Sequence, residues 1–346
     1  MRPVALAAAL LLLGCPTSTP EPPGPPAREP LPDRATDVLC APLNAQGEAR
    51  ALLSETGCFP EGAPSGDLIP FTVRSPLWTD GALKERWLAV PPDQVIGFSP
   101  NGAWSFPEGS VLAKSFLRDV DDVVEIRLMT KRVDGWTFAS YMQSGDDATY
   151  VEEAVIEPIP MADGSTVDWY FPDPAACATC HADGALGPVS AQLDTAYDYG
   201  DGVRSQLAEF ARVGLFDTDA PNADFVLPEP SDEAEPLQGR ARSWLHANCA
   251  HCHQPGGWTP PEMDMDLRAD TPFGAARLCG VPVQFETAPE AGAWRIAPGD
   301  SADSALWGRP AAAGIMRMPP LGVTRLDPLA ADLLPSWIDG LTDCPE

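Results

Sequence analysis

Residues 237–253, LQGRARSWLHANCAHCH, decide the fold class of the C-terminal part of the chain. Apolar residues recur at helical spacing as far as Asn248 and predict a helix over 237–248. A Cys-x-x-Cys-His pattern follows at once, and a second complete copy lies upstream. The cysteines and histidines of the two copies are Cys177, Cys180, His181, Cys249, Cys252 and His253. The chain holds only 4 histidines, so chance is a poor explanation for this duplication.

This pattern is typical of the covalent attachment of c-type haem. One helical turn between the cysteines lets both thiols reach the two vinyl groups on one porphyrin edge, and the next imidazole then faces the iron. We therefore predict two covalently attached haems. The thioether residues are Cys177, Cys180, Cys249 and Cys252, and the iron ligands are His181 and His253. A four-thiolate zinc site and a redox-active dithiol are the alternatives, but neither requires the histidine.

Further motifs follow the second copy. Met316-Arg-Met318-Pro319 lies about one small domain downstream, and residues 327–341 have the apolar spacing of a helix that contains Pro335. A helix before Cys-x-x-Cys-His, a later Met-Pro and a terminal helix resemble a class I cytochrome c. The resemblance implies that Met318 is the sixth iron ligand, with Met316 as its rival, and that its thioether raises the reduction potential.

The first copy has no Met-Pro near it. Its haem could have no sixth protein ligand, and a small molecule such as peroxide would then have access to the iron. The side chains that could instead supply the ligand are Met142, Met161, Met263, Met265 and His246.

The N-terminal residues indicate export. Arg2 precedes an apolar run that is too short to span a bilayer, and the run ends at Leu-Gly-Cys15. This ending resembles the lipobox of bacterial lipoproteins, which implies a signal peptide over 1–14 and lipidation of Cys15. A buried core helix is the alternative. The Pro-rich residues 15–36 are expected to form an extended tether.

Four further cysteines are expected to form disulfides in an exported protein. They allow three pairings, and the most economical joins Cys40 to Cys58 and Cys279 to Cys344. Four free buried thiols are the alternative.

Residues 37–170 have a different pattern. Short alternating apolar runs separated by Gly, Pro, Asp and Asn predict an antiparallel β-sandwich or barrel-like domain, with a hairpin turn at Asp134-Gly135. The fold class is therefore α+β, with mostly helical haem domains after the β-rich domain. We expect a first haem-binding segment over 171–231 and a class I cytochrome c-like domain over 232–346. The aromatic and charged residues 75–87 are either a ligand surface or a structured loop, and we favour the loop.

Composition limits the partners. With 22 Lys and Arg against 50 Asp and Glu, the formal net charge is −28. Nucleic-acid binding is excluded because it requires clustered basic residues. An acidic surface favours redox partners with basic docking surfaces. We find no nucleophile–base set, so an ordinary hydrolase is not expected.

Taken together, the chain resembles a family of exported bacterial di-haem c-type cytochromes. The resemblance implies an envelope-anchored, periplasm-facing or outer-membrane lipoprotein that transfers electrons between redox proteins, with no catalytic residues. Two alternatives are a peroxidase-type enzyme with a five-coordinate first haem, and a redox-sensing protein whose β-domain binds a partner. Besides the haem motifs, the stretches that carry the resemblance are 68–71, 75–82, 106–116, 186–188, 240–253, 298–306 and 318–322.

Overall fold

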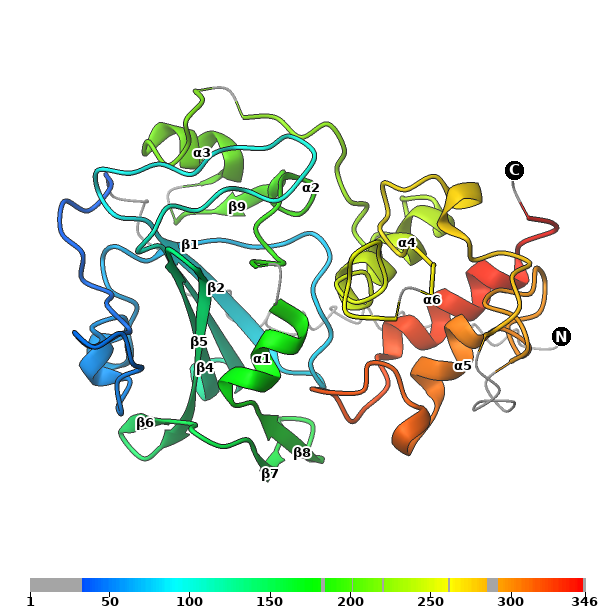
Figure 1. The fold of residues 1–346 in the computed structure, drawn as a ribbon, viewed down its shortest axis with the longest axis horizontal. Coiled ribbons are helices and arrows are strands. Elements are labelled where there is room, and N and C mark those ends of the chain that lie inside the picture. The colour runs from blue at the N-terminus through cyan, green and yellow to red at the C-terminus, as the bar shows by residue number, and fades with distance from the viewer. Residues whose placement is uncertain are drawn as a thin grey trace, which may run out of the picture.

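The computed structural model describes residues 33–181, 184–200, 202–219, 221–260, 262–284 and 292–344. The expected signal peptide, Cys15 and almost all of the expected tether lie outside these ranges. The predicted α+β class is confirmed: an antiparallel sheet comes first in the chain, and several short helices follow it (Figure 1).

The main sheet is a six-stranded antiparallel meander in which each strand pairs with its neighbours in sequence. A hairpin joins the fourth and fifth strands as predicted, but its turn residues are Val133-Asp134 and not Asp134-Gly135, because Gly135 already pairs with Arg132. The strands of this sheet are β1 (Ile69–Pro70), β2 (Leu83–Ala89), β3 (Val111–Asp119), β4 (Asp122–Arg132), β5 (Gly135–Ser144) and β6 (Asp147–Tyr150). Two further antiparallel pairs are β7 (Val155–Pro160) with β8 (Thr166–Phe171), and β9 (Ala196–Asp198) with β10 (Val203–Ser205).

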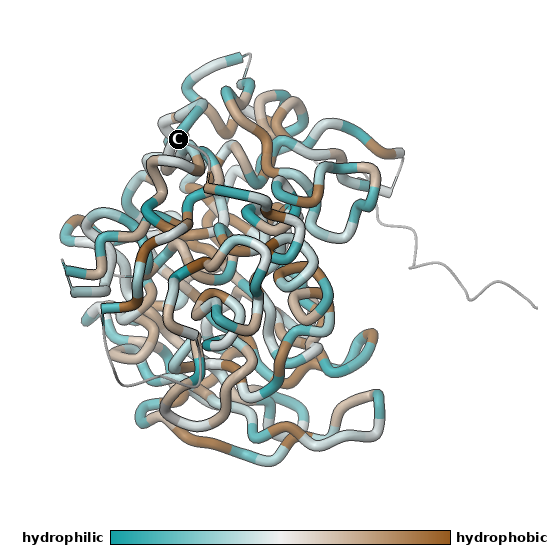
Figure 2. Tube along the Cα trace, turned by 90° about the vertical axis from the view of Figure 1, so that its right-hand side faces the viewer, coloured by the Kyte–Doolittle hydropathy of each residue, from teal (hydrophilic) through white to brown (hydrophobic). Residues whose placement is uncertain are grey.

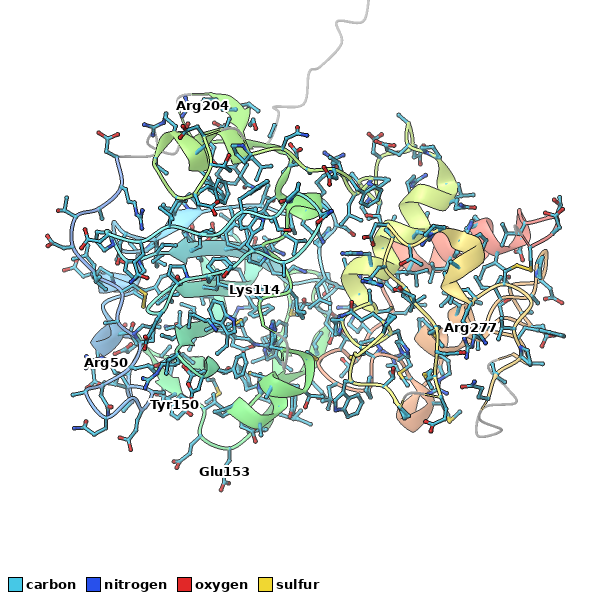
Figure 3. All side chains as sticks on the ribbon, turned by 45° about the horizontal axis from the view of Figure 1, so that its top comes forward. Arg50, Lys114, Tyr150, Glu153, Arg204 and Arg277 are labelled. Carbon is cyan, nitrogen blue, oxygen red and sulfur yellow. A yellow bond between two sulfur atoms is a disulfide. The ribbon has the colours of Figure 1, made fainter. Side chains whose placement is uncertain are left out.

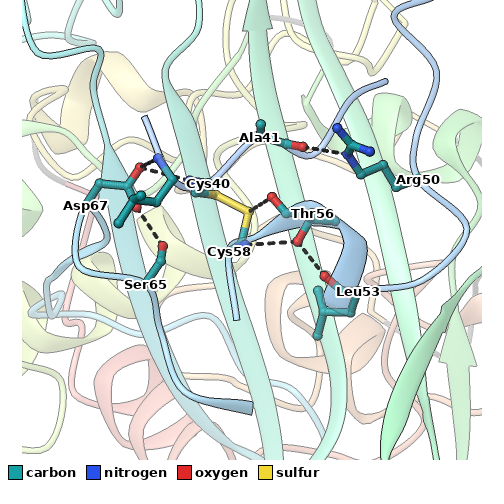
Figure 4. The surroundings of a disulfide bond; sticks show 9 residues. Cys40, Ala41, Arg50, Leu53, Thr56, Cys58, Ser65 and Asp67 are labelled. Carbon is teal, nitrogen blue, oxygen red and sulfur yellow. Dashed lines mark hydrogen bonds between the residues drawn. A yellow bond between two sulfur atoms is a disulfide. The ribbon is translucent and has the colours of Figure 1, made fainter. Parts of the chain in front are cut away.

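One face of the main sheet packs against the segment that precedes it. Trp87, Leu128 and Tyr141 from this face form a buried cluster with Cys40 and Cys58. These two cysteines form a disulfide, and the Asp67 carboxylate accepts the Leu39 and Cys40 N–H groups at 2.8 and 2.9 Å (Figure 4). The disulfide therefore joins two parts of the N-terminal segment, and the apolar cluster holds that segment on the sheet.

The opposite face has apolar ends and a charged centre. Leu88 and Leu112 belong to the apolar cluster at one end, which contains Phe210, and Phe116 and Trp169 belong to the cluster at the other end. The helix that carries the first Cys-x-x-Cys-His copy packs against β5 on the same side of the molecule (Figure 1). The charged centre of this face therefore lies next to that helix, and we call it the polar strip.

The helices lie mainly in the second half of the chain. The predicted helices at 237–248 and 327–341 are confirmed, the second ending at Asp339. The α-helices are α1 (Pro174–His181), α2 (Ser190–Leu193), α3 (Gln206–Arg212), α4 (Leu237–Asn248), α5 (Ala305–Ala311) and α6 (Pro328–Asp339). Single 3₁₀ turns are η1 (Ser54–Thr56), η2 (Pro60–Gly62), η3 (Phe273–Ala276) and η5 (Gly314–Met316).

Helices α4 and α6 pack together and form the core of the C-terminal region. Ala241, Leu245, Leu334 and Ile338 are at most 1% exposed in this core. A second disulfide, Cys279–Cys344, joins residues that are 65 positions apart. Both predicted pairings are therefore confirmed.

The disulfides are typical of proteins outside the cytoplasm. Hydropathy changes sign frequently along the chain (Figure 2). Within the described ranges, every helix is too short or too polar to cross a membrane.

Candidate haem-binding site

The first Cys-x-x-Cys-His copy forms the C-terminal half of α1. Asp173 begins this helix: its carboxylate accepts the Ala176 N–H at 2.7 Å, and its carbonyl accepts the Cys177 N–H at 3.1 Å. The His181 ring lies 5.8 Å from the Phe138 ring of β5. Both cysteines and the histidine are half-buried. The helix therefore holds all three groups on the sheet while leaving part of their surface open for a bound group.

The orientation of the His181 ring suits an iron ligand. Its Nδ1 lies 3.1 Å from the Gly184 carbonyl oxygen, which can only accept a hydrogen bond, so Nδ1 carries the proton. Burial lowers the pKa of His181 to about 4, and the ring is therefore neutral at pH 7. Nε2 then keeps its lone pair, as metal ligation requires.

The second copy begins where α4 ends. The Cys249 carbonyl accepts the N–H groups of both Cys252 and His253, at 3.1 and 3.0 Å, so the motif is a tight turn that continues the helix. Burial lowers the pKa of His253 to about 4. Its Nδ1 is buried and has no hydrogen-bond partner within the described part of the chain.

The structure brings the two copies together although 67 residues lie between them. The thiols of Cys180 and Cys252 lie near enough to act on each other, and His251 also acts on Cys180. The neighbouring Cys252 thiol lowers the pKa of Cys180, and Cys180 raises the pKa of Cys252. Burial raises the pKa of Cys177 to about 11 and that of Cys249 to about 12. The predicted thioether residues therefore belong to a single site between α1 and α4.

The predicted sixth ligand of the second haem lies in the loop after η5. The Met318 N–H donates to the Arg309 carbonyl of α5 at 3.1 Å, and the positive charge of Arg309 contributes to the lowered pKa of His253. Met316 ends η5 two residues earlier. The Met318 thioether makes no hydrogen bond to the described residues, so its assignment as a ligand stays a prediction.

The candidates for the sixth ligand of the first haem are dispersed. Met142 lies opposite Glu125 on the polar strip of the sheet, whereas Met161 is buried in the turn that joins β7 to β8. Met265 packs in the C-terminal core, and Met263 is half-buried before it. His246 accepts the Ala269 N–H through Nδ1 at 3.2 Å, and this bond fixes its ring.

Sequence reasoning missed a line of basic residues beside α1. Arg86, Lys114 and Arg127 occupy facing positions on β2, β3 and β4, so their side chains lie on one face of the sheet. We call these three residues the cation row. The charges of Lys114 and Arg127 act on His181, and Arg127 also interacts with both thiols of α1. The one signal in the sequence that could have revealed the cation row was the presence of charged residues inside predicted strands.

Of the expected loop over 75–87, residues 75–82 form a structured loop, whereas 83–87 belong to strand β2. We call this loop the clasp, because it joins the sheet region to the C-terminal region. Ser75 Oγ donates to the Ser243 carbonyl of α4 at 2.9 Å, and the Trp78 N–H donates to Asn248 Oδ1 at 2.7 Å. The Asp80 carboxylate accepts the N–H groups of Thr324 and Arg325 at 2.8 Å. The clasp therefore fixes the end of α4 and the loop after Met318 relative to the sheet.

Comparisons with known proteins identify no relative. No family model, curated protein or solved structure matches the chain. Among the described residues, no group of three or more His, Cys, Asp or Glu side chains could hold a metal ion.

Proposed function

We propose that the protein is a di-haem c-type cytochrome of the cell envelope that transfers electrons between redox proteins. The observation that carries the proposal is the meeting of the two Cys-x-x-Cys-His copies through Cys180 and Cys252. Covalent attachment at neighbouring thiols keeps two redox centres in one site, which favours electron transfer between them.

The residues present fit haem. Each copy supplies two thiols and one neutral imidazole, and the bond from His181 Nδ1 to Gly184 leaves Nε2 available to iron. Cys177 and Cys180 would hold one haem and Cys249 and Cys252 the other. Haem supplies a reversible one-electron couple, whose potential depends on axial ligand, burial and nearby charge. The chain itself positions the ligands.

The proposal also assigns the two regions of the chain and the membrane anchor. The C-terminal region is a class I cytochrome c-like domain with Met318 as the distal ligand. The region before it is a β-sandwich or barrel-like domain. Lipidation of Cys15 anchors the protein at a membrane, and the two disulfides support the extracytoplasmic location on which this assignment depends.

The test is a haem count on the full chain matured in a cytochrome-c-competent host. We expect two haems per chain by pyridine haemochrome, one haem after Cys177→Ala with Cys180→Ala, and one after Cys249→Ala with Cys252→Ala. The Cys40→Ala, Cys58→Ala pair is the matched control, because it also removes two cysteines and should leave two haems. A colourless wild-type protein, or one that contains zinc, would refute the proposal.

A further inference from the structure

The cation row carries more charge than the fold neutralises. Glu125 is 0% exposed and binds Arg127 through two hydrogen bonds, at 2.7 and 2.9 Å. Glu125 is also held by Ser140 and by Trp169 Nε1, the latter at 2.9 Å. Arg127 therefore has a complete partner, and Glu125 has little capacity left for other cations.

Arg86 and Lys114 have no such partner. Neither side chain forms an ion pair or hydrogen bond with any of the described residues, and Lys114 Nζ lies 4.8 Å from the Phe116 ring centroid. Burial lowers the pKa of Arg86 to about 10 and that of Lys114 well below its ordinary value. Figure 3 shows Lys114 near the middle of the sheet region, whereas Arg50 and Glu153 lie towards its edge.

The chain contains 50 acidic residues, but among the described carboxylates Glu125 is the one that acts on Lys114. A cation that is partly buried without an ionic partner lowers the stability of the fold, unless an anion from outside the chain binds to it. Both Arg86 and Lys114 are half-buried, so each keeps surface for such an anion.

We propose that Arg86 and Lys114 bind the porphyrin carboxylates of the group attached to Cys177 and Cys180. The inference rests on the proposed function, because a haem is the source of these carboxylates. Its location follows from α1: the charge of Lys114 acts on His181, and the charge of Arg127 acts on the two thiols. A guanidinium and an ammonium are suitable partners for carboxylates.

The positive charges of Arg86 and Lys114 then raise the reduction potential of the first haem. A positive charge beside the porphyrin favours the ferrous state, because reduction removes one positive charge from the iron. Lys114→Gln should shift the redox equilibrium of the first haem about tenfold towards ferric, which corresponds to about 59 mV for one electron. Arg86→Gln should act in the same direction. The second haem should change much less.

The experiment measures both haem potentials by spectroelectrochemical titration of the mature full chain. Arg132→Gln is the matched control: it removes one charge from β4, but Arg132 alternates with the row and packs near Gly47 on the opposite face. Urea unfolding of the haem-free chain is the second readout. There Lys114→Gln should raise the stability, because the variant removes a buried charge that has no partner.

The outcomes are distinguishable. Two haems with unchanged potentials in both row variants would overturn the inference and leave the proposed function intact. Absence of haem from the wild-type protein would overturn both. Calorimetry with inorganic phosphate is the third arm: Lys114-dependent phosphate binding by the mature protein would assign the row to a free oxyanion and overturn the porphyrin assignment. Absence of phosphate binding, together with a shifted first potential, supports it.

Discussion

At the scale of single residues, Asp80 illustrates how one side chain can fix two regions of the chain. Its carboxylate is 3% exposed and accepts three hydrogen bonds from Thr324 and Arg325 at 2.8–3.1 Å. Two of the donors are backbone N–H groups that would otherwise be unsatisfied in the interface between the clasp and the loop after Met318. Loss of this carboxylate therefore affects the loop as well as the clasp.

We expect Asp80→Ala to destabilise the protein by about 3 kcal/mol, because it leaves buried donors without an acceptor. Urea unfolding measures the change. Asp163→Ala is the matched control: Asp163 forms an exposed pair with Arg325 at 3.1 Å, and its removal should lower the stability much less than Asp80→Ala does. Equal effects of the two substitutions would contradict the role of Asp80.

The sequence indicated the chemistry expected of the two Cys-x-x-Cys-His copies, but it did not show which residues these copies and Asp80 contact. Cys-x-x-Cys-His depends on local spacing, so both copies are visible in the sequence, and their haem attachment stays a prediction. The proximity of Cys180 and Cys252 depends on how α1 and α4 meet, and no local pattern contains that information. The same holds for Asp80, whose partners are more than 240 positions away along the chain.

At the scale of elements, the contact between α4 and α6 holds the second Cys-x-x-Cys-His copy in place. Trp244 Nε1 donates to Asp327 Oδ2 at 2.7 Å, and Asp327 Oδ1 accepts the Leu329 N–H at 2.9 Å as the N-cap of α6. One carboxylate therefore begins α6 and joins it to the helix that leads into Cys249.

Asp327→Ala should lower the stability by about 2–3 kcal/mol, since it removes a helix cap and leaves the buried indole N–H of Trp244 unpaired. Asp332→Ala, also on α6 but exposed and without a hydrogen-bond partner among the described residues, is the control. Thermal unfolding of the mature protein provides the measurement. If the two variants melt at the same temperature, the cap and the link to α4 contribute little.

Helices α4 and α6 could be predicted because a buried apolar stripe recurs every three or four residues. The cation row could not. Alternation within a strand says that Lys114 and Phe116 share a face, but it does not say which strands are neighbours or whether that face is covered. Antiparallel register places Arg86, Lys114 and Arg127 in line, and that register becomes known only from the folded sheet.

At the scale of the whole molecule, acidic residues far outnumber basic ones. The formal net charge of the chain is −28, and the three basic residues of the cation row are half-buried. An electron-transfer protein with such a net charge attracts basic partners over distances comparable to the Debye length, which is about 10 Å at 0.1 M salt.

The negative net charge predicts that the rate of electron transfer to a basic partner depends on the salt concentration. The rate constant for electron transfer from the reduced protein to a small basic redox protein should fall about tenfold or more as ionic strength rises from about 0.01 to 0.5 M, because screening removes the long-range attraction. Stopped-flow mixing measures this rate. A neutral small-molecule oxidant is the control, since its encounter rate has no such attraction to lose. If the basic protein and the neutral oxidant respond alike to salt, the acidic surface does not steer association, and docking must depend on short-range contacts instead.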